Sequence, residues 1–539
     1  MRISTGQGIP SGTKSGSEPR GFRHLPIELF SGPNGRFIFD ARKVAFIEVD
    51  EPLFSVLGLL REEDLAPEEL TKRLSRYPGS EVRKAHRRFR KLQKDGYLVP
   101  GPFRREPKYD RAQIEQVLSR KTGGFTVMIS TQCNLSCSYC IYGGSYRRFE
   151  KLAAQRMSWE TAKNMLDFLI RNAPDSESLR LDFFGGEPLL EFALMKRCVE
   201  YLKARLGPSG PEVVSTIASN GTILTEEILD FLIENKVYLQ FSLDGGPRIH
   251  DARRKIKSNG QGTYARVIRN LERIHRRDPN YFQERMRLKC VVSMASLAER
   301  EDRFDSHPLV RAIREKGNLS PVVEERHYDR SLDGPYWEQL HRIRRRLLRL
   351  RGVKKVAEIL DPLPPRRRAF FDMTFGQFMD VQAVNTLYFG DAESVPFRKS
   401  CLMGYREGAV YPDGRITVCH KAPSFTIGNV NAGGWDFDRI WELYSGLNDP
   451  YEGCQGCFVQ RFCDLCFEKL DGGETGRSMA RESFCRSKRA ELHFIFDTML
   501  RVLARNPRLW TDVNAFMVNK IKEKLSEAAP ESTIGRDRA

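Results

Sequence analysis

Three cysteines within eight residues are the part of this sequence best suited to chemistry. Cys133, Cys137 and Cys140 directly follow residues 125–130, an apolar run with the composition of a buried strand. Thiolates bind zinc or iron–sulfur clusters, and such clusters are normally held by four cysteines. Three thiolates would therefore leave one iron of a four-iron cluster open to another ligand. A zinc knuckle or three structural thiols are the plainer alternatives.

The spacing Cys-x3-Cys-x2-Cys resembles the signature of the radical S-adenosylmethionine (SAM) enzymes. In that family the open iron binds the amino and carboxylate groups of SAM, and an electron from the cluster releases a 5′-deoxyadenosyl radical. The resemblance implies that Cys133, Cys137 and Cys140 are the catalytic cluster ligands, with Tyr139 beside the cofactor.

Composition narrows the class of protein. The chain has 539 residues, of which 40% are hydrophobic and 29% charged, and this predicts a globular protein of several domains. No apolar run is long enough for a membrane helix, and residues 1–21 lack the apolar core of a signal peptide, so we expect a cytoplasmic protein without membrane contact. Twelve cysteines in a reducing compartment favour metal ligation over disulfides.

The net charge of +18 admits a nucleic acid, an acidic peptide or only a solvated surface. The most basic run, residues 341–351, has apolar residues at helical spacing. It predicts an amphipathic helix with a solvated basic face, so a nucleic-acid partner is not expected.

Residues 21–105 predict a small N-terminal domain. Strands are expected at 36–40 and 44–49, then helices at 52–60 and 67–76, a third helix from its N-cap Ser80 to Lys94, and a strand at 97–99. This layout is a winged helix. It resembles the peptide-recognition element of maturases of ribosomally made peptides, in which a leader peptide adds as a strand to the hairpin edge. A DNA-binding winged helix is the alternative, because the third helix is basic at Arg83, Lys84, Arg87, Arg88, Arg90 and Lys91.

Residues 106–330 predict an α/β domain with a parallel sheet, because strand-like runs alternate with amphipathic helices. The helices are expected at 159–171, 188–206, 226–234 and 264–276. The six units match the partial (β/α)6 barrel of the radical SAM family. The strands are expected at 125–130, 179–184, 213–219, 238–243, 288–294 and 321–325.

Polar motifs follow three of these strands, where an α/β sheet places its ligands. The glycines of Gly-Gly-Glu-Pro let the backbone approach a ligand closely, and a carboxylate can accept from an ammonium group. For most of these residues turn chemistry is the alternative. The resemblance implies SAM contacts at Gly185, Gly186, Glu187, Pro188, Ser219, Asn220, Ser242, Asp244 and Arg254.

Seven further cysteines lie between residues 401 and 485. A turn at 411–414 between two short strands would bring Cys419 back toward Cys401. The pattern resembles the SPASM extension, which carries auxiliary [4Fe–4S] clusters in peptide-modifying radical SAM enzymes. It implies one cluster on Cys454, Cys457, Cys463 and Cys485, and another on Cys401, Cys419 and Cys466.

The chain departs from that family in two ways. Relatives have three residues before the last cysteine of the central block, where this chain has two, and residues 391–400 offer no fourth cysteine for the second auxiliary cluster. That cluster is expected to have an open iron or a ligand other than cysteine. Zinc at the Cys-x2-Cys pairs is the alternative. Cys198 and Cys290 are expected to be buried small hydrophobes.

Together these patterns predict three [4Fe–4S] clusters, SAM as cofactor and a ribosomally synthesised precursor peptide as partner, with a ferredoxin or flavodoxin as electron donor. Residues 399–490 would be the SPASM domain, 331–398 a helical bridge, 491–539 C-terminal helices, and 1–20 a disordered tail. The favoured reaction is a crosslink, thioether rather than carbon–carbon. The alternatives are an anaerobic sulfatase-maturing enzyme, an RNA-modifying enzyme, and a non-catalytic electron carrier or peptide chaperone.

Overall fold

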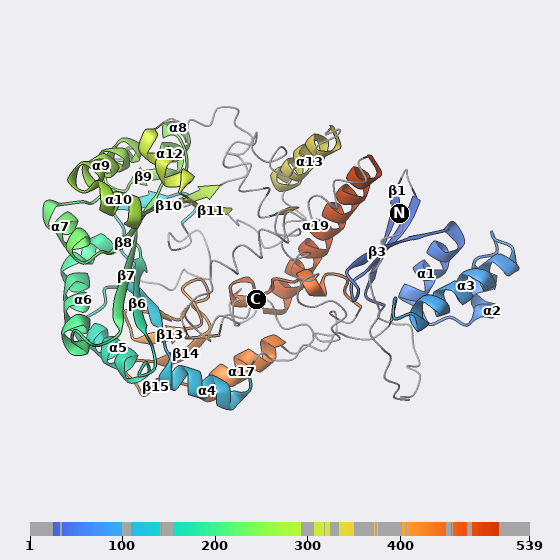
Figure 1. Cartoon of the computed structure of the whole chain (residues 1–539), viewed down its shortest axis with the longest axis horizontal. Coiled ribbons are helices and arrows are strands. Elements are labelled where there is room, and N and C mark those ends of the chain that lie inside the picture. The colour runs from blue at the N-terminus through green and yellow to red at the C-terminus, as the bar shows by residue number, and fades with distance from the viewer. Residues whose placement is uncertain are drawn as a thin grey trace.

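The structure, a computed structural model, divides into a large curved sheet covered by helices at one end and a small N-terminal unit at the other (Figure 1). The long helix α19 (Arg477–Arg505) lies between them. The residues described are 25–32, 35–99, 109–140, 142, 155–292, 307–316, 319–323, 334–349, 371, 374–375, 402–405, 407–448, 454, 456–471 and 477–505.

The N-terminal unit is a three-stranded antiparallel sheet followed by three helices. Its elements are β1 (Ile27–Gly32), β2 (Gly35–Asp40), β3 (Ala45–Val49), α1 (Glu51–Glu62), α2 (Pro67–Arg73) and α3 (Gly79–Lys94). The two predicted strands and three predicted helices are confirmed.

Three details of this unit differ from the sequence prediction. Strand β1 was not foreseen. Residues 97–99 form no strand, because Leu98 has a positive φ of 52° and its amide donates to Asp40 at 2.8 Å, so the chain turns there. Helix α3 begins at Gly79 with Pro78 at its N-cap, so Ser80 lies inside the helix.

Both faces of the N-terminal sheet are buried. Ile38 and Phe39 are neighbours on β2, and both are fully buried. Because successive side chains of a strand point to opposite faces, they enter different cores. Ile38 packs with the helices of its own unit, whereas Phe39 belongs to the core of the rest of the protein. The sheet therefore lies between two hydrophobic cores, that of the N-terminal unit and that of the rest of the protein.

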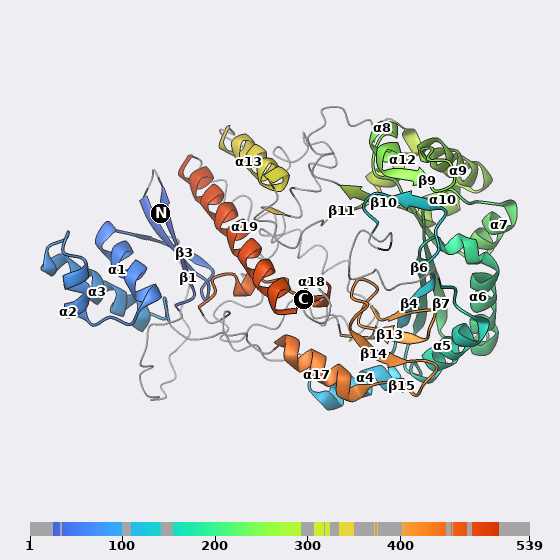
Figure 2. The ribbon, with the colours of Figure 1, turned by 180° about the vertical axis from the view of Figure 1, so that it is seen from behind.

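Six parallel strands of the described residues form the large sheet in the order β11-β10-β8-β7-β6-β4, and the predicted α/β fold is confirmed. The strands are β4 (Gly124–Ser130), β6 (Ser178–Gly185), β7 (Glu212–Ser219), β8 (Tyr238–Ser242), β10 (Met286–Val292) and β11 (Leu319–Val323). Helices lie on the outer side of the sheet (Figures 1 and 2). They are α5 (Trp159–Arg171), η2 (Pro188–Glu191), α6 (Phe192–Leu206), α7 (Glu226–Glu234), α8 (Pro247–Arg253), α9 (Tyr264–Arg277), α10 (Pro279–Arg285) and α12 (Pro308–Glu315).

Side chains alternate between the two faces of these strands. On β6, Leu179, Leu181 and Phe183 are buried in the core, while Asp182 and Phe184 are half-buried on the opposite, inner face. The inner face is therefore the polar one, and it is the face left for a site. Cys198 and Cys290 are buried in the core, as predicted.

The C-terminal segment extends the same sheet. Strand β12 (Ala409–Val410) pairs in parallel with β4, through Ala409 opposite Thr126 and Val410 opposite Val127. The predicted hairpin around Gly414, whose φ is +85°, is confirmed, and it continues the sheet to ten strands in the described part of the chain. The remaining elements are β13 (Arg415–Thr417), β14 (Thr426–Asn429), β15 (Gly434–Trp435), α17 (Phe437–Asn448), η8 (Gln460–Phe462) and α18 (Phe467–Leu470).

Two helix pairs tie the segments together. Helix α4 (Arg111–Arg120) lies beside α17 in both views, and Arg111 bonds Asp438 at 2.6 Å. Helix α13 (Gly334–Arg349) packs on α19 through its apolar face, with Leu340 fully buried, so the predicted amphipathic helix is confirmed. Within the described residues, no helix combines the length and the apolar character that crossing a membrane requires.

Candidate active site

A short two-stranded ribbon fixes the loop that carries the first three cysteines. Strand β5 (Leu135–Cys137) pairs antiparallel with β9 (Arg254–Ile256), so that Cys137 lies opposite Arg254. Two further backbone bonds extend this pairing: Ser138 donates to Arg253 at 3.0 Å, and Lys257 donates to Asn134 at 2.9 Å. The loop is thus held by the segment after α8, which the sequence did not foresee because both strands are only three residues long.

The thiols of Cys133, Cys137 and Cys140 are half-buried neighbours. Burial raises the pKa of Cys137 to about 12, with a smaller contribution from Cys140 and Cys133 and an opposing one from Arg254. Such thiols need a bound metal to lose their protons. In the described part of the chain, no three His, Cys, Asp or Glu side chains converge as ligands of a single ion. In an iron–sulfur cluster each thiolate binds its own iron.

Gly185 and Gly186, at the end of β6, allow the turn after this strand to lie against the start of the cysteine loop. A side-chain carbon at Gly185 would lie 2.1 Å from the carbonyl oxygen of Ser130, and one at Gly186 would lie 2.0 Å from that of Gln132. Backbone amides close the contact, since Gly186 donates to Ser130 and Glu187 to Gln132, both at 2.8 Å. The sequence analysis gave these glycines to a ligand, whereas in the structure they permit contact with the protein's own backbone.

Glu187 is fully buried and already binds three donors. Its carboxylate accepts from the Leu189 amide at 3.0 Å, the Ser219 hydroxyl at 2.9 Å and the Asn220 amide at 2.7 Å. Burial raises its pKa to about 7, although these bonds oppose the shift. A carboxylate offers about four lone-pair positions, so one remains for a donor such as an ammonium group.

Asn220 connects the turn after β7 to the cysteine loop. Its amide nitrogen donates to Asn134 at 2.8 Å and reaches the Cys133 sulfur at 3.8 Å, while its oxygen accepts from Thr222 at 2.6 Å. Asn134 in turn donates to Thr222 at 2.9 Å, which closes a ring of three side chains. The sequence analysis missed Asn134 and Thr222, since nothing in the spacing connects them.

Asp244 and Arg254 bind one another. Asp244 is fully buried and accepts from Arg254 Nε at 2.8 Å, from the Val291 amide at 2.9 Å and from the Tyr139 hydroxyl. Burial would raise its pKa, but Arg254 and these hydrogen bonds outweigh burial and lower it. The Tyr139 ring also lies against two guanidinium groups, with Arg253 at 4.1 Å and Arg254 at 5.3 Å from its centroid.

The buried pair of Asp244 and Arg254 holds the cysteine loop against the turn after β8. Among the described residues, the Nη atoms of Arg254 have no hydrogen-bond partner, and Ser242 ends β8 half-buried on the inner face. Pro188 is buried at the start of η2. Contact of these residues with SAM stays a prediction.

The C-terminal thiols lie in two groups. Burial raises the pKa of Cys485 to about 12, and the thiols of Cys463, Cys454 and Cys457 raise it further. Arg489 adjoins the same thiols and places a positive charge beside them. Cys419, whose pKa is likewise raised to about 12 by burial, neighbours Cys466. The sequence analysis formed the same two groups, except that Cys401 lies outside the described residues; their ligand roles stay predictions.

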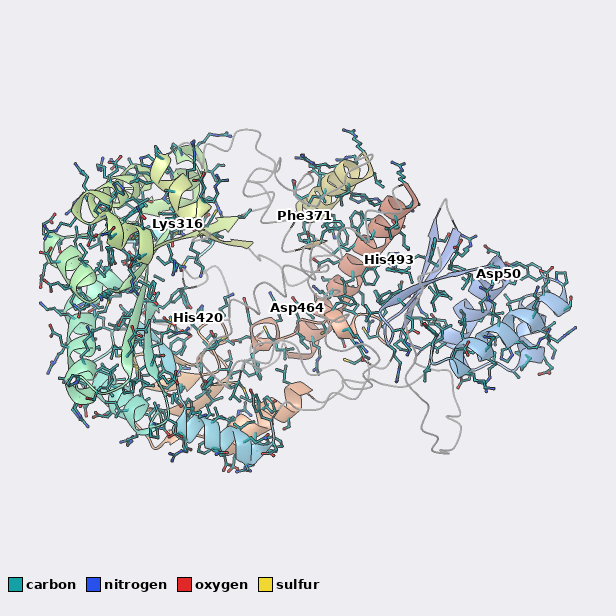
Figure 3. The ribbon with its side chains drawn as sticks, in the orientation of Figure 1. Asp50, Lys316, Phe371, His420, Asp464 and His493 are labelled. Atoms are coloured by element: carbon teal, nitrogen blue, oxygen red, sulfur yellow. The ribbon has the colours of Figure 1, made fainter. Side chains whose placement is uncertain are left out.

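The segment after Cys419 docks on the inner face of the large sheet, beside the cysteine loop. The His420 ring lies 4.7 Å from that of Phe184 on β6, and its carbonyl accepts from the hydroxyls of Tyr142 at 3.0 Å and Tyr411 at 3.2 Å. Figure 3 labels His420 inside the curve of the sheet. Since Tyr142 follows Cys140, the two cysteine regions meet here, which the sequence could not indicate.

Comparison with known proteins shows similarity to radical SAM proteins. Residues 127–282 match the sequence model of the radical SAM superfamily. The radical SAM cyclopropyl synthase TigE of Paramaledivibacter caminithermalis is 24% identical over 246 residues, which make up 43% of this chain and 50% of TigE. The cysteine-type anaerobic sulfatase-maturating enzyme of Clostridium perfringens is 21% identical over 388 residues, 69% of this chain and 96% of that enzyme.

Among solved structures, native anSMEcpe with bound AdoMet aligns at 18% identity and a TM-score of 0.47, over 71% of this chain and 99% of that one. The chain spans about half the length of TigE and 43% of the length of the uncharacterized protein MJ0907 of Methanocaldococcus jannaschii, to which it is 29% identical over 135 residues. The superfamily match contains the cysteine loop and the turns that hold it, so residues 127–282 form a domain of the radical SAM type.

Proposed function

We propose that this enzyme modifies a ribosomally synthesised peptide, holding its leader on the N-terminal sheet and crosslinking its core at the inner face of the barrel. The observation that carries the proposal is the outer edge of β3. Among the described residues β3 pairs only with β2, so no described strand covers its other edge, to which a peptide could add as a further strand.

A basic helix contacts the residue that follows β3. Helix α3 packs on α1 and α2, with Val82, Ala85 and Phe89 buried, and Arg88 bonds Asp50, the residue after β3, at 2.9 Å. Its basic side chains are exposed, at Arg83, Lys84, Arg87, Arg88, Arg90 and Lys91. An acidic leader lying along β3 would therefore gain charge complementarity as well as backbone hydrogen bonds.

Cys133, Cys137 and Cys140 would hold the first cluster, and Glu187, Ser242 and Arg254 would face SAM. When bound, that cluster and SAM together supply a 5′-deoxyadenosyl radical. The protein's own part is to fix the loop through Asp244, Tyr139 and the β5–β9 ribbon, and to bury the site against water. A second set, Cys454, Cys457, Cys463 and Cys485, fits an auxiliary cluster because four half-buried thiols lie beside the cation of Arg489.

We favour a thioether as the product. Forming one removes the thiol hydrogen and one carbon-bound hydrogen from the peptide, so the peptide loses two hydrogens and keeps its sulfur. Sulfatase maturation is the second candidate, because the sulfatase-maturating relative aligns over 96% of its own length. Formation of formylglycine from cysteine would instead remove the sulfur.

The test uses the anaerobically reconstituted enzyme with SAM and dithionite, co-incubated with short peptides encoded beside its gene. We expect 5′-deoxyadenosine and a peptide that has lost two hydrogens and whose cysteine no longer reacts with iodoacetamide. A modified sulfatase peptide with no change in any neighbouring peptide would contradict the proposal and establish the second candidate.

A further inference from the structure

The inner face of the N-terminal sheet carries a cluster of aromatic rings. Phe46 projects from β3 and Phe39 from β2, with ring centroids 5.1 Å apart. Both rings pack on Phe496 of α19, Phe39 at 4.5 Å and Phe46 at 5.5 Å. The edge strand proposed for peptide binding therefore contacts α19 directly.

The same helix ring contacts the loop that carries the auxiliary thiols. Phe496 lies 5.6 Å from Phe462 and 6.2 Å from Phe458. Phe462 immediately precedes Cys463, and Phe458 immediately follows Cys457. Two ring contacts thus connect β3 to the backbone of two thiols that we assign to the auxiliary cluster.

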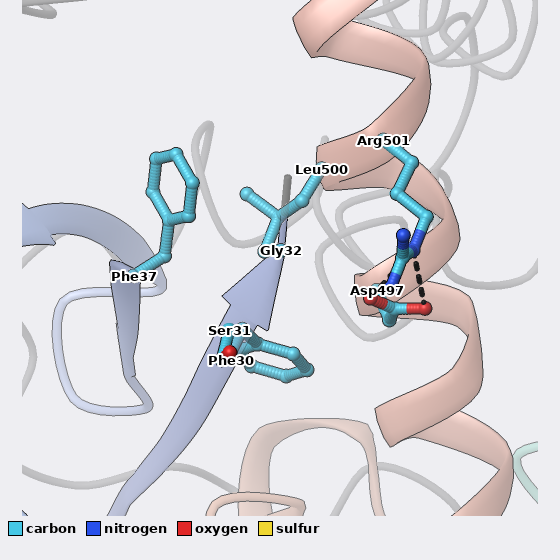
Figure 4. Close-up of a pocket in the computed structure, with 7 residues that line it drawn as sticks. All are labelled: Phe30, Ser31, Gly32, Phe37, Asp497, Leu500 and Arg501. Atoms are coloured by element: carbon cyan, nitrogen blue, oxygen red, sulfur yellow. Dashed lines mark hydrogen bonds and ion pairs between the residues drawn. The ribbon is translucent and has the colours of Figure 1, made fainter. Parts of the chain in front are cut away.

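The seam between the sheet and α19 is packed unevenly. At its hairpin end there is a shallow pocket lined by Phe30, Ser31, Gly32, Phe37, Asp497, Leu500 and Arg501 (Figure 4). Further along α19, His493 faces the sheet (Figure 3) and bonds Glu28 at 2.9 Å. Phe30, which lines this pocket, also packs on α19, with its ring 4.7 Å from that of His493 and 6.0 Å from that of Phe496.

We infer that Phe46 is a positioning residue that couples the β3 edge to the cluster of Cys454, Cys457, Cys463 and Cys485. This inference rests on the proposed function for the cluster and for the peptide edge. A strand that adds to β3 fixes the backbone of Phe46, and close-packed rings pass a displacement on instead of absorbing it. The reduction potential of an iron–sulfur cluster depends on its burial and on hydrogen bonds to its sulfurs, so movement of the loop changes that potential.

The adjacent residue provides a matched control. Ile47 lies on the same strand and is also half-buried, but it packs on the helices of the N-terminal unit and not on α19. We compare Phe46→Ala with Ile47→Ala in the full-length, reconstituted enzyme without peptide. The readouts are a redox titration of the auxiliary clusters by electron paramagnetic resonance, and hydrogen exchange of residues 456–463 in the apoprotein.

We expect Phe46→Ala to change the ratio of reduced to oxidised cluster at the wild-type midpoint by at least about threefold, which is about 28 mV for one electron because a tenfold change is 59 mV. Exchange over residues 456–463 should quicken in the same variant. Ile47→Ala should leave both unchanged, and Phe46→Leu, which keeps an apolar side chain, should lie between Phe46→Ala and the wild type.

Equal shifts in Phe46→Ala and Ile47→Ala would overturn the coupling, as would no shift in Phe46→Ala. A separate control addresses the cluster itself. If Cys457→Ala leaves the iron content and the auxiliary signals unchanged, no cluster occupies this site, and both the proposed cluster and the coupling fail. If Cys457→Ala loses a signal that Phe46→Ala does not move, the coupling alone fails.

Discussion

Replacing Asp244 with asparagine should destabilise the protein and release the cysteine loop. Asp244 and Arg254 form an ion pair with side-chain exposures of 0% and 7%. Removing one partner of a buried pair leaves the other charge uncompensated, and such changes cost about 3–5 kcal/mol. Asparagine keeps one acceptor oxygen, so it can still satisfy either Val291 or Tyr139 but not the charge of Arg254.

The sheet contains a matched control for this change. Asp182 pairs with Arg180 at 2.8 Å on the inner face of β6, but these side chains are 24% and 36% exposed. Glu407 lies 4.0 Å from the Arg180 guanidinium and would remain as its counter-charge, so Asp182→Asn should cost about 1 kcal/mol or less. The structure thus predicts a difference of at least about 2 kcal/mol between two substitutions of the same type.

Two measurements test this reasoning. Urea unfolding gives the loss of stability for each variant, and iron content with 5′-deoxyadenosine yield reports on the cysteine loop. Asp244→Asn should lose iron at the first cluster and most SAM cleavage, since Arg254, which lies opposite Cys137 in the β5–β9 ribbon, loses its counter-charge. Asp182→Asn should keep both. If the two variants lose equal stability and both retain iron, the buried pair does not hold the loop.

Three further outcomes are expected. Cys133→Ala should abolish 5′-deoxyadenosine formation under dithionite, because two thiolates cannot hold the SAM-binding cluster; a normal yield would contradict that. Gly186→Ala should lower the thermal midpoint far more than Gly446→Ala, since an added carbon would lie 2.0 Å from the Gln132 oxygen at the first position and has no neighbour within 4 Å at the second; similar midpoints would show that the turn can move away. Glu187 binds its proton more tightly when folded, with a pKa raised from 4.5 to about 7, so the stability it contributes below pH 4.5 is lost as pH rises through 7. Urea unfolding at pH 5 and pH 8 should show a fall of about 3 kcal/mol that Glu187→Gln lacks, and an unchanged pH dependence in the variant would refute the shift.

Much of the α/β fold follows from local sequence. Residues 124–130 and 178–185 form strands at the predicted places, and α5 and α7 have the predicted bounds. Long apolar runs and amphipathic periodicity decide these elements. The β5–β9 ribbon was missed because each of its short strands is stabilised by a partner far along the chain, whereas β1 was missed although its partner β2 follows directly.

The candidate site was predictable in its residue types but not in its connections. The resemblance to the SPASM extension implied two groups of C-terminal thiols. That Asp244 binds Arg254, or that His420 packs on Phe184, depends on which turns the fold brings together. Local spacing holds no information about such contacts, and the ligand roles assigned to these residues stay predictions.

The pairing of β12 with β4 has a consequence for how the protein is made. All seven residues of β4 are buried in the finished structure, yet the partner on its outer edge is about 280 residues further along the chain. At a translation rate of about 5–20 residues per second, that edge waits roughly a quarter of a minute to a minute for its partner. During this interval an apolar strand with open backbone groups is exposed to other nascent chains. Expression at lower temperature with co-produced chaperones should therefore raise the yield of folded enzyme, and a polar substitution on β4 would not be tolerated as a remedy, because the same strand supports the cysteine loop.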